Sequence, residues 1–73
     1  MNAISVNKDI LSGTPVFDGT RVPVTILFDY LEDDKLIDFL ENYPTVSKEQ
    51  VTQVIKLAST LVSRGRLVNE NLN

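Results

Sequence analysis

A capping sequence followed by a polar helix face is the stretch of this chain best suited to recognition chemistry. Ser47-Lys48-Glu49-Gln50 has a serine and a glutamine three residues apart, which is typical of the first turn of a helix. On a helical wheel, the polar side chains that follow lie opposite the apolar ones. Lysine binds phosphate and glutamine pairs with the edge of adenine, so this face is predicted to fit a nucleic-acid groove. The residues expected to contact DNA are Arg21, Ser47, Lys48, Glu49, Gln50, Thr52, Gln53 and Lys56.

Two alternative interpretations stay open for these residues. Every surface helix has a polar face, so exposure to solvent alone accounts for lysine, threonine and glutamine on it. Arg21 stands beside Pro23, where its guanidinium can pair with a carboxylate such as Asp18 and hold a turn instead of reaching a phosphate.

Most catalytic and metal chemistry is excluded by composition. The chain has no cysteine and no histidine, so it has no disulfide, no thiolate zinc site and none of the commonest general bases. The acidic side chains between Asp29 and Asp38 lack the spaced loop with a central glycine that binds calcium. We therefore expect no enzyme activity, no cofactor and no metal.

Charge is divided along the sequence, although the net charge is only -3. Residues 29–41 contain six acidic side chains and one lysine, whereas residues 48–66 contain four basic side chains and one glutamate. The negative net charge opposes nucleic-acid binding, whereas the separate basic end partly restores the attraction to phosphate. The sequence has no apolar run long enough to span a membrane and begins without the features of a signal peptide, so a cytoplasmic protein is predicted.

Three helices are predicted from apolar spacing. The first begins at Val24, and it has a main apolar stripe and a second patch at Ile26 and Tyr30. The second is brief and stops before Pro44, with Asp33 or Asp34 expected as its N-cap. The main apolar positions of these two helices are Val24, Leu27, Phe28 and Leu31, then Leu36, Phe39, Leu40 and Tyr43.

The third helix is expected to be the longest and to run from its capping box to about Ser63, with Gly65 as a C-terminal cap. Residues 64–73 follow it as a tail that either frays or docks on a partner through Leu67, Val68 and Leu72. The apolar positions of the helix itself are Val51, Val54, Ile55, Ala58, Leu61 and Val62.

Short strands are predicted before the helices. Alternation over residues 4–7 indicates one strand, and Asp18-Gly19 indicates a tight turn between the arms 16–17 and 20–22. Such arms bury too little apolar surface alone, so the helices or a second chain must cover them. A dimer is expected, with an interface at Ile4, Val6, Val16, Phe17, Val22, Ile26 and Tyr30.

The fold predicted from these patterns is mainly α, a three-helix helix-turn-helix domain preceded by short N-terminal strands or a hairpin. Its parts are the strands and hairpin at residues 1–23, the three-helix core at 24–63 and a flexible tail at 64–73.

Several motifs together resemble the small bacterial proteins of domain-of-unknown-function family 433, over about residues 4–60. The motifs are the doubled glycine phrase Gly13-Thr14-Pro15-Val16-Phe17-Asp18-Gly19-Thr20-Arg21-Val22-Pro23-Val24, then Leu27-Phe28-Asp29-Tyr30-Leu31, Phe39-Leu40, Tyr43-Pro44 and Val46-Ser47-Lys48-Glu49-Gln50-Val51. The chain departs from the family at Asp33-Asp34-Lys35, where members usually have a glycine and then a serine or threonine cap.

The resemblance implies a homeodomain-like fold, a homodimer and the role of antitoxin in a toxin–antitoxin pair. It implies a PIN-like nuclease as the toxin and operator DNA as the ligand of the third helix. A protein-interaction module, or a stand-alone transcriptional regulator without a toxin, is the alternative.

Overall fold

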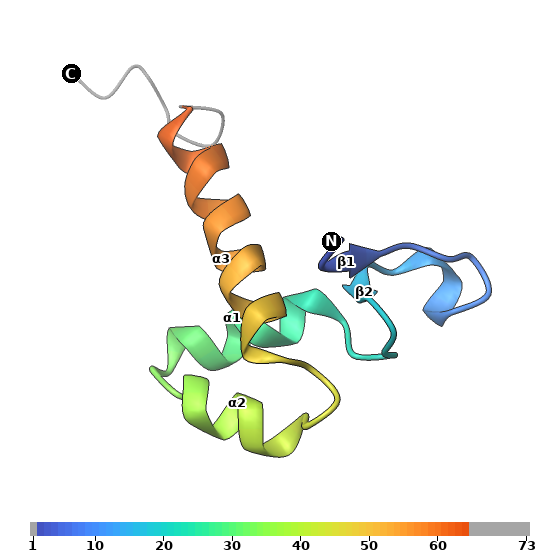
Figure 1. The fold of residues 1–73 in the computed structure, drawn as a ribbon, viewed down its shortest axis with the longest axis horizontal. Coiled ribbons are helices and arrows are strands. Elements are labelled where there is room, and N and C mark those ends of the chain that lie inside the picture. Colours follow the sequence, from blue (N-terminus) through green and yellow to red (C-terminus); the bar gives the residue numbers. More distant parts are fainter. Residues whose placement is uncertain (1, 65–73) are drawn as a thin grey trace.

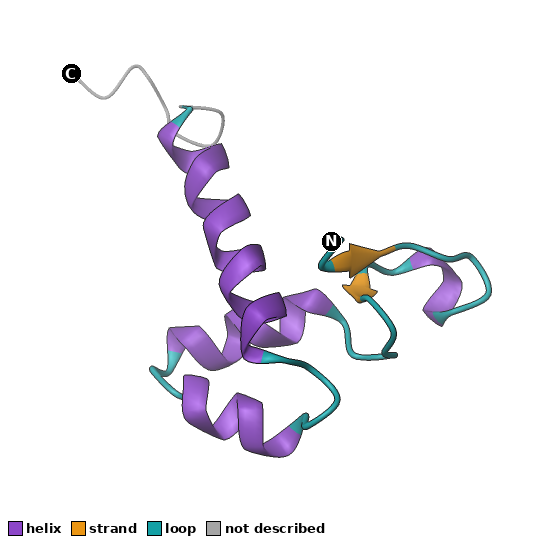
Figure 2. Ribbon diagram, in the orientation of Figure 1, coloured by secondary structure: helices purple, strands orange, loops and turns teal. Residues whose placement is uncertain are grey.

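The computed structural model describes residues 2–64, which form three helices preceded by a small hairpin (Figures 1 and 2). This confirms the predicted mainly helical architecture. In chain order the elements are β1 (Ile4–Ser5), the 3-10 turn η1 (Leu11–Gly13), β2 (Val16–Phe17), α1 (Val24–Glu32), α2 (Leu36–Asn42) and α3 (Lys48–Ser63).

β2 pairs along both of its edges: the predicted return arm meets it through an isolated antiparallel bridge between Val16 and Pro23, and β1, which the sequence does not predict as its partner, pairs with the other edge. β2 lies antiparallel to β1, with Ile4 opposite Phe17, and the 20–22 arm forms no strand. That arm returns along the other side of β2 through a bond from the Phe17 amide to the Val22 carbonyl (3.0 Å). The turn itself is where the sequence places it, because Gly19 has φ +78° and the Thr20 amide donates to the Phe17 carbonyl. β2 is therefore enclosed on both edges.

One hydrophobic core joins the hairpin to all three helices. Phe17 from β2, Leu27 from α1 and Phe39 from α2 have no exposed surface, and α3 adds Val51 and Val54. Because residues from every segment meet here, the short strands are covered by the helices of the same chain. The buried cluster consists of Phe17, Val24, Leu27, Phe39, Val46, Val51 and Val54.

Four aromatic rings form the centre of this core. Phe39 packs against Phe17, Tyr30 and Tyr43, with ring centroids 5.9, 5.5 and 5.1 Å away. The two tyrosines meet edge to face at 6.0 Å. Tilted and edge-to-face pairs of this kind stabilise a core beyond the area they bury. Phe39 on α2 and Tyr43 directly after it thus pack α2 against Tyr30 of α1.

The turn between α1 and α2 closes α1 with a left-handed residue. Asp34 has φ +56°, its amide donates to the Leu31 carbonyl, and the Lys35 amide donates to the Tyr30 carbonyl (2.9 Å). This pair of bonds is the Schellman motif, in which glycine is the usual left-handed residue. The prediction that Asp33 or Asp34 caps α2 is wrong, because Lys35 is its N-cap residue and no side chain caps it.

α3 has the predicted bounds and projects out of the body of the molecule (Figure 1). Its first half covers the core, whereas its second half extends beyond α1 and the hairpin. Within residues 2–64, no helix has the length and apolar content required to cross a membrane.

Candidate nucleic-acid interface

Gln50 joins the start of α3 to the hairpin. Its Oε1 accepts from the Ser47 amide (3.0 Å), and the Ser47 Oγ accepts from the Gln50 amide (3.1 Å), which is the predicted capping box. Its Nε2 donates to the Asp18 carbonyl in the turn after β2 (2.9 Å). Both ends of the Gln50 amide are therefore occupied within the chain, and we remove Gln50 from the residues expected to read DNA bases.

The polar face of α3 is free of core contacts. Lys48, Thr52, Gln53 and Lys56 are all exposed. The Thr52 hydroxyl donates to the Lys48 carbonyl (2.9 Å), which leaves its oxygen available as an acceptor. These side chains, with Glu49, lie on the first three turns of α3, and a groove-binding helix makes its contacts near its N-terminus.

Arg21 lies on the same side of the molecule as the start of α3. It is exposed and lines a shallow hollow together with Asp18, Thr20 and Thr45. Thr45 precedes the Ser47 cap by two residues, and the Gln50 bond to Asp18 holds the two segments together. Arg21 and the N-terminus of α3 thus form one surface built from two segments distant in sequence.

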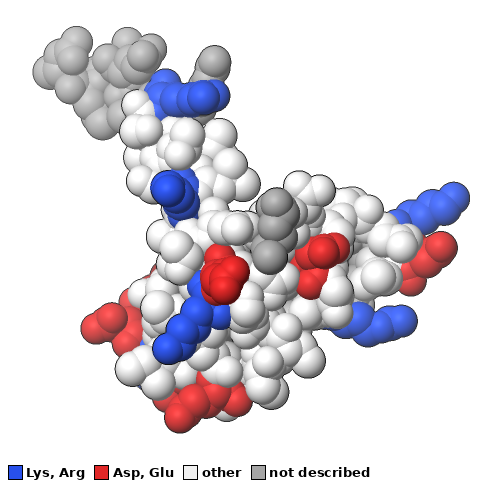
Figure 3. All heavy atoms as spheres, viewed as in Figure 1, with Lys and Arg blue, Asp and Glu red and all other residues white. Residues whose placement is uncertain are grey.

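Acidic and basic side chains are only partly separated on this surface. Figure 3 shows basic atoms and no acidic ones on the projecting half of α3, whereas acidic and basic atoms both lie over the body of the molecule. The acidic residues of α1, α2 and their turn are all exposed: Asp29, Glu32, Asp33, Asp34, Asp38 and Glu41. Among residues 2–64, no three His, Cys, Asp or Glu side chains are arranged to hold a metal ion.

The residues expected at a dimer interface are fully buried, half-buried or exposed in the structure. Val16 and Phe17 are fully buried within one chain, so they have no surface to offer and we remove them from that interface. Val6 is 64% exposed. The others pack against the core of their own chain and are half-buried: Ile4, Val22, Ile26 and Tyr30.

The second half of α3 exposes apolar side chains that its helical period places on the core side. Leu57, Leu61 and Val62 are 52%, 41% and 49% exposed, and Ile55 is 36% exposed. Ile55, Leu61 and Val62 belong to the apolar stripe predicted from the helical period, whereas Leu57 lies at its edge, and periodicity does not show where the body of the molecule ends. The predicted Gly65 cap and tail lie outside the described residues.

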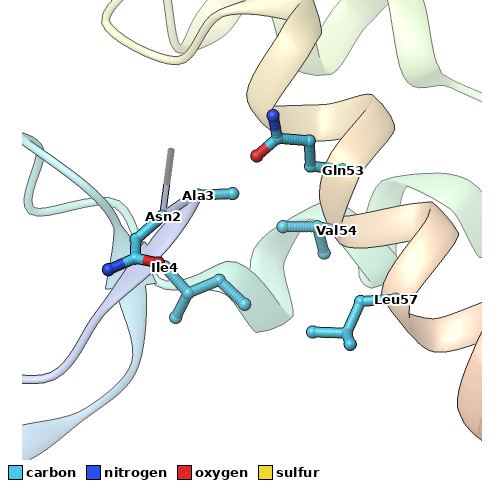
Figure 4. A pocket seen from close by; sticks show the side chains of 6 residues that line it. All are labelled: Asn2, Ala3, Ile4, Gln53, Val54 and Leu57. Carbon is cyan, nitrogen blue, oxygen red and sulfur yellow. The ribbon is translucent and has the colours of Figure 1, made fainter.

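A groove separates β1 from α3 next to this exposed stretch. Figure 4 shows Ala3 and Ile4 on one wall and Val54 and Leu57 on the other, with Gln53 at the rim. Since Leu57 belongs both to the groove and to the exposed half of α3, the two apolar surfaces are continuous.

Comparison with known proteins identifies a family and nothing closer. The family described as Protein of unknown function (DUF433) matches residues 4–58. No curated protein and no solved structure matches the chain. Because the family match covers more than half of the sequence, the chain belongs to the DUF433 family.

Proposed function

We propose that this chain is an antitoxin-like DNA-binding protein, in which α3 contacts operator DNA and the acidic end contacts a nuclease-type toxin. The observation that supports it is the exposed polar face of α3, with Lys48 and Lys56 outward and the capping box fixing the helix start. In the sequence its basic side chains are separate from the acidic segment 29–41, and in space Lys56 lies on the far side of Lys48, which borders α2.

The contacts proposed for DNA come in two kinds. Lys48, Lys56 and Arg21 are suited to phosphates, since they are exposed cations around the start of α3. Thr52 and Gln53 are suited to base edges, because both are exposed on the first two turns; Gln53 stands at the rim of the groove beside β1. Ser47 and Gln50 act indirectly in this proposal, by holding the helix end in place.

A salt series of DNA binding tests the cationic contacts. The probe is a duplex from the region upstream of the chain's own coding sequence, and affinity is measured from low to moderate salt. Lys56→Ala should weaken binding and lower the slope of log affinity against log salt by about 1, because one phosphate contact is lost. Lys35→Ala is the matched control, since it removes another exposed cation, at the acidic end, and should leave the slope unchanged.

The two slopes decide the DNA part of the proposal. Equal slopes for Lys56→Ala and Lys35→Ala would exclude α3 as the DNA-binding element. Absence of any salt-dependent binding to the upstream duplex would exclude DNA binding as a whole.

Co-expression with the product of the neighbouring gene tests the toxin part. A nuclease-like product should co-purify with this chain, and the double charge reversal Asp33→Lys/Glu41→Lys should weaken the complex, because both carboxylates are exposed at the acidic end. Asp9→Lys/Asp18→Lys is the control, since it makes the same change in net charge near the hairpin. If both double variants keep the complex equally well, the acidic end is not the toxin contact. If no partner co-purifies while DNA binding persists, the chain is a stand-alone regulator.

A further inference from the structure

The projecting half of α3 carries an apolar face that no described segment of the chain covers. Ile55, Leu57, Leu61 and Val62 are each 36% to 52% exposed, and half-buried Ala58 lies among them. Single exposed apolar residues are ordinary, but Ile55, Leu61 and Val62 share one face over two helical turns, with Leu57 at its edge. We name these five residues the α3 patch.

The spacing within and around the α3 patch is that of a coiled-coil seam. Val51, Val54, Ala58 and Leu61 follow one another at intervals of three, four and three residues. In the sequence the same intervals continue to Gly65, Val68 and Leu72, which lie outside the described residues. Alternating intervals of three and four keep one seam facing a second helix. Val51 and Val54 are buried within the chain, whereas Leu61 is exposed and Ala58 half-buried, so among the described residues these two positions are left for another helix.

The residues beside the seam favour an identical helix. Ile55 and Val62 flank the seam on one side and Leu57 on the other. In coiled coils that pair with a different chain, these flanking positions usually carry charged residues that select the partner, whereas here they are apolar. Between Val51 and Ser63 the single charged residue is Lys56, which lies on the opposite, polar face. Two copies can therefore approach through this face without bringing like charges together.

We propose that a second copy of this chain occupies the α3 patch, so that two α3 helices pair through their projecting halves in a symmetric dimer. Each copy contributes the same residues, as a two-fold interface requires. The groove beside Leu57, lined by Ala3 and Ile4, extends the apolar surface from α3 to β1. This pairing needs neither DNA nor toxin, and it places the dimer contact on α3 and not on β2.

The arrangement is compatible with a free DNA-binding face. The polar residues of α3 lie on the side of the helix opposite the α3 patch. Lys48 and Thr52 are exposed in its first turns, which pack on the body of the molecule and not in the projecting half. Dimerisation through the projecting half would thus leave the start of each α3 accessible.

Cysteine cross-linking of the full chain tests the pairing directly. The sequence contains no cysteine, so a single introduced thiol reports one position. Leu61→Cys on the α3 patch should form a disulfide-linked dimer under mild oxidation. Ser59→Cys is the matched control, because Ser59 is exposed on the polar face two residues away and should remain largely uncrosslinked. Equal cross-linking of the two variants would overturn the proposal.

Sedimentation equilibrium gives a second readout that needs no oxidation. At about 100 μM, where even a weak pairing is populated, the natural chain should sediment as a dimer. Leu61→Asp should raise the dissociation constant on the order of 100-fold, since a charge would be buried in each half of the interface. Ser59→Asp should leave it unchanged. Because Leu61 is exposed in the single chain, far-UV circular dichroism of both variants should match the natural chain. A monomeric natural chain, or equal dissociation constants for the two variants, would overturn the proposal.

Discussion

Gln50→Ala tests the conclusion that Gln50 holds the fold together and does not read DNA. The substitution removes the Oε1 bond to the Ser47 amide (3.0 Å) and the Nε2 bond to the Asp18 carbonyl (2.9 Å), and it leaves the backbone half of the capping box in place. A side-chain hydrogen bond in an exposed setting contributes about 0.5–1 kcal/mol to the free energy of unfolding. The two bonds together predict a loss of about 1–2 kcal/mol.

For a domain of this size, that loss lowers the melting temperature by roughly 4–16 °C. Thermal unfolding of the full chain, followed by far-UV circular dichroism, measures the shift. Gln53→Ala is the matched control, because it shortens the same type of side chain at an exposed position three residues further along α3, and it should move the melting temperature by no more than about 4 °C.

DNA binding separates the two roles, when it is measured well below both melting temperatures. Gln50→Ala should keep most of the affinity, whereas Gln53→Ala should lose affinity if the proposed base contact is made. Unchanged melting of Gln50→Ala, combined with a large loss of DNA affinity, would refute the structural role assigned here to Gln50.

Three further substitutions test the turn, the core and the aromatic cluster. Asp34→Gly should raise the free energy of unfolding by about 0.5–1 kcal/mol in urea titrations, because glycine adopts φ +56° without the strain of a side chain; a destabilised variant would contradict the Schellman assignment. Phe39→Ala should cost about 3–5 kcal/mol, a large part of the stability of so small a domain, whereas Phe28→Ala at a 36% exposed position should cost under about 1 kcal/mol in the same titrations. Desolvation, and then the neighbouring Tyr30, raise the pKa of Tyr43 above its ordinary value of 10.0, so the folded state holds that proton more tightly. Stability should therefore be retained below pH 10.0 and should fall as the pH rises beyond it, and Tyr43→Phe should remove this part of the alkaline loss.

Local rules in the sequence predict α3 and the position of the hairpin turn well. The capping box needs only Ser47 and Gln50, and the turn needs only Gly19, so neither depends on distant residues. The bounds of α1 and α2 follow from apolar spacing and from Pro44 in the same way.

Contacts between distant segments account for most of what the sequence does not predict. β2 pairs with β1 and not chiefly with the 20–22 arm, since the loop between the strands is what brings Ile4 beside Phe17. Gln50 binds Asp18 across 32 positions, a contact that no local pattern indicates. Asp34 is a good helix cap in isolation, but the Schellman bonds at the end of α1 require it to be left-handed. The exposure of the apolar side chains in the second half of α3 depends on how far the core extends along the helix, and helical periodicity does not indicate that length.

The aromatic cluster also gives this chain a built-in optical signal. The sequence has no tryptophan, and both of its tyrosines, Tyr30 and Tyr43, lie in the cluster 6.0 Å apart. Tyrosine absorption and emission therefore come from this cluster alone, and they report on the packing of α1 against α2. A tryptophan introduced at Leu57 would be spectrally distinct, so association through α3 and loosening of the core become separately observable in one unlabelled sample.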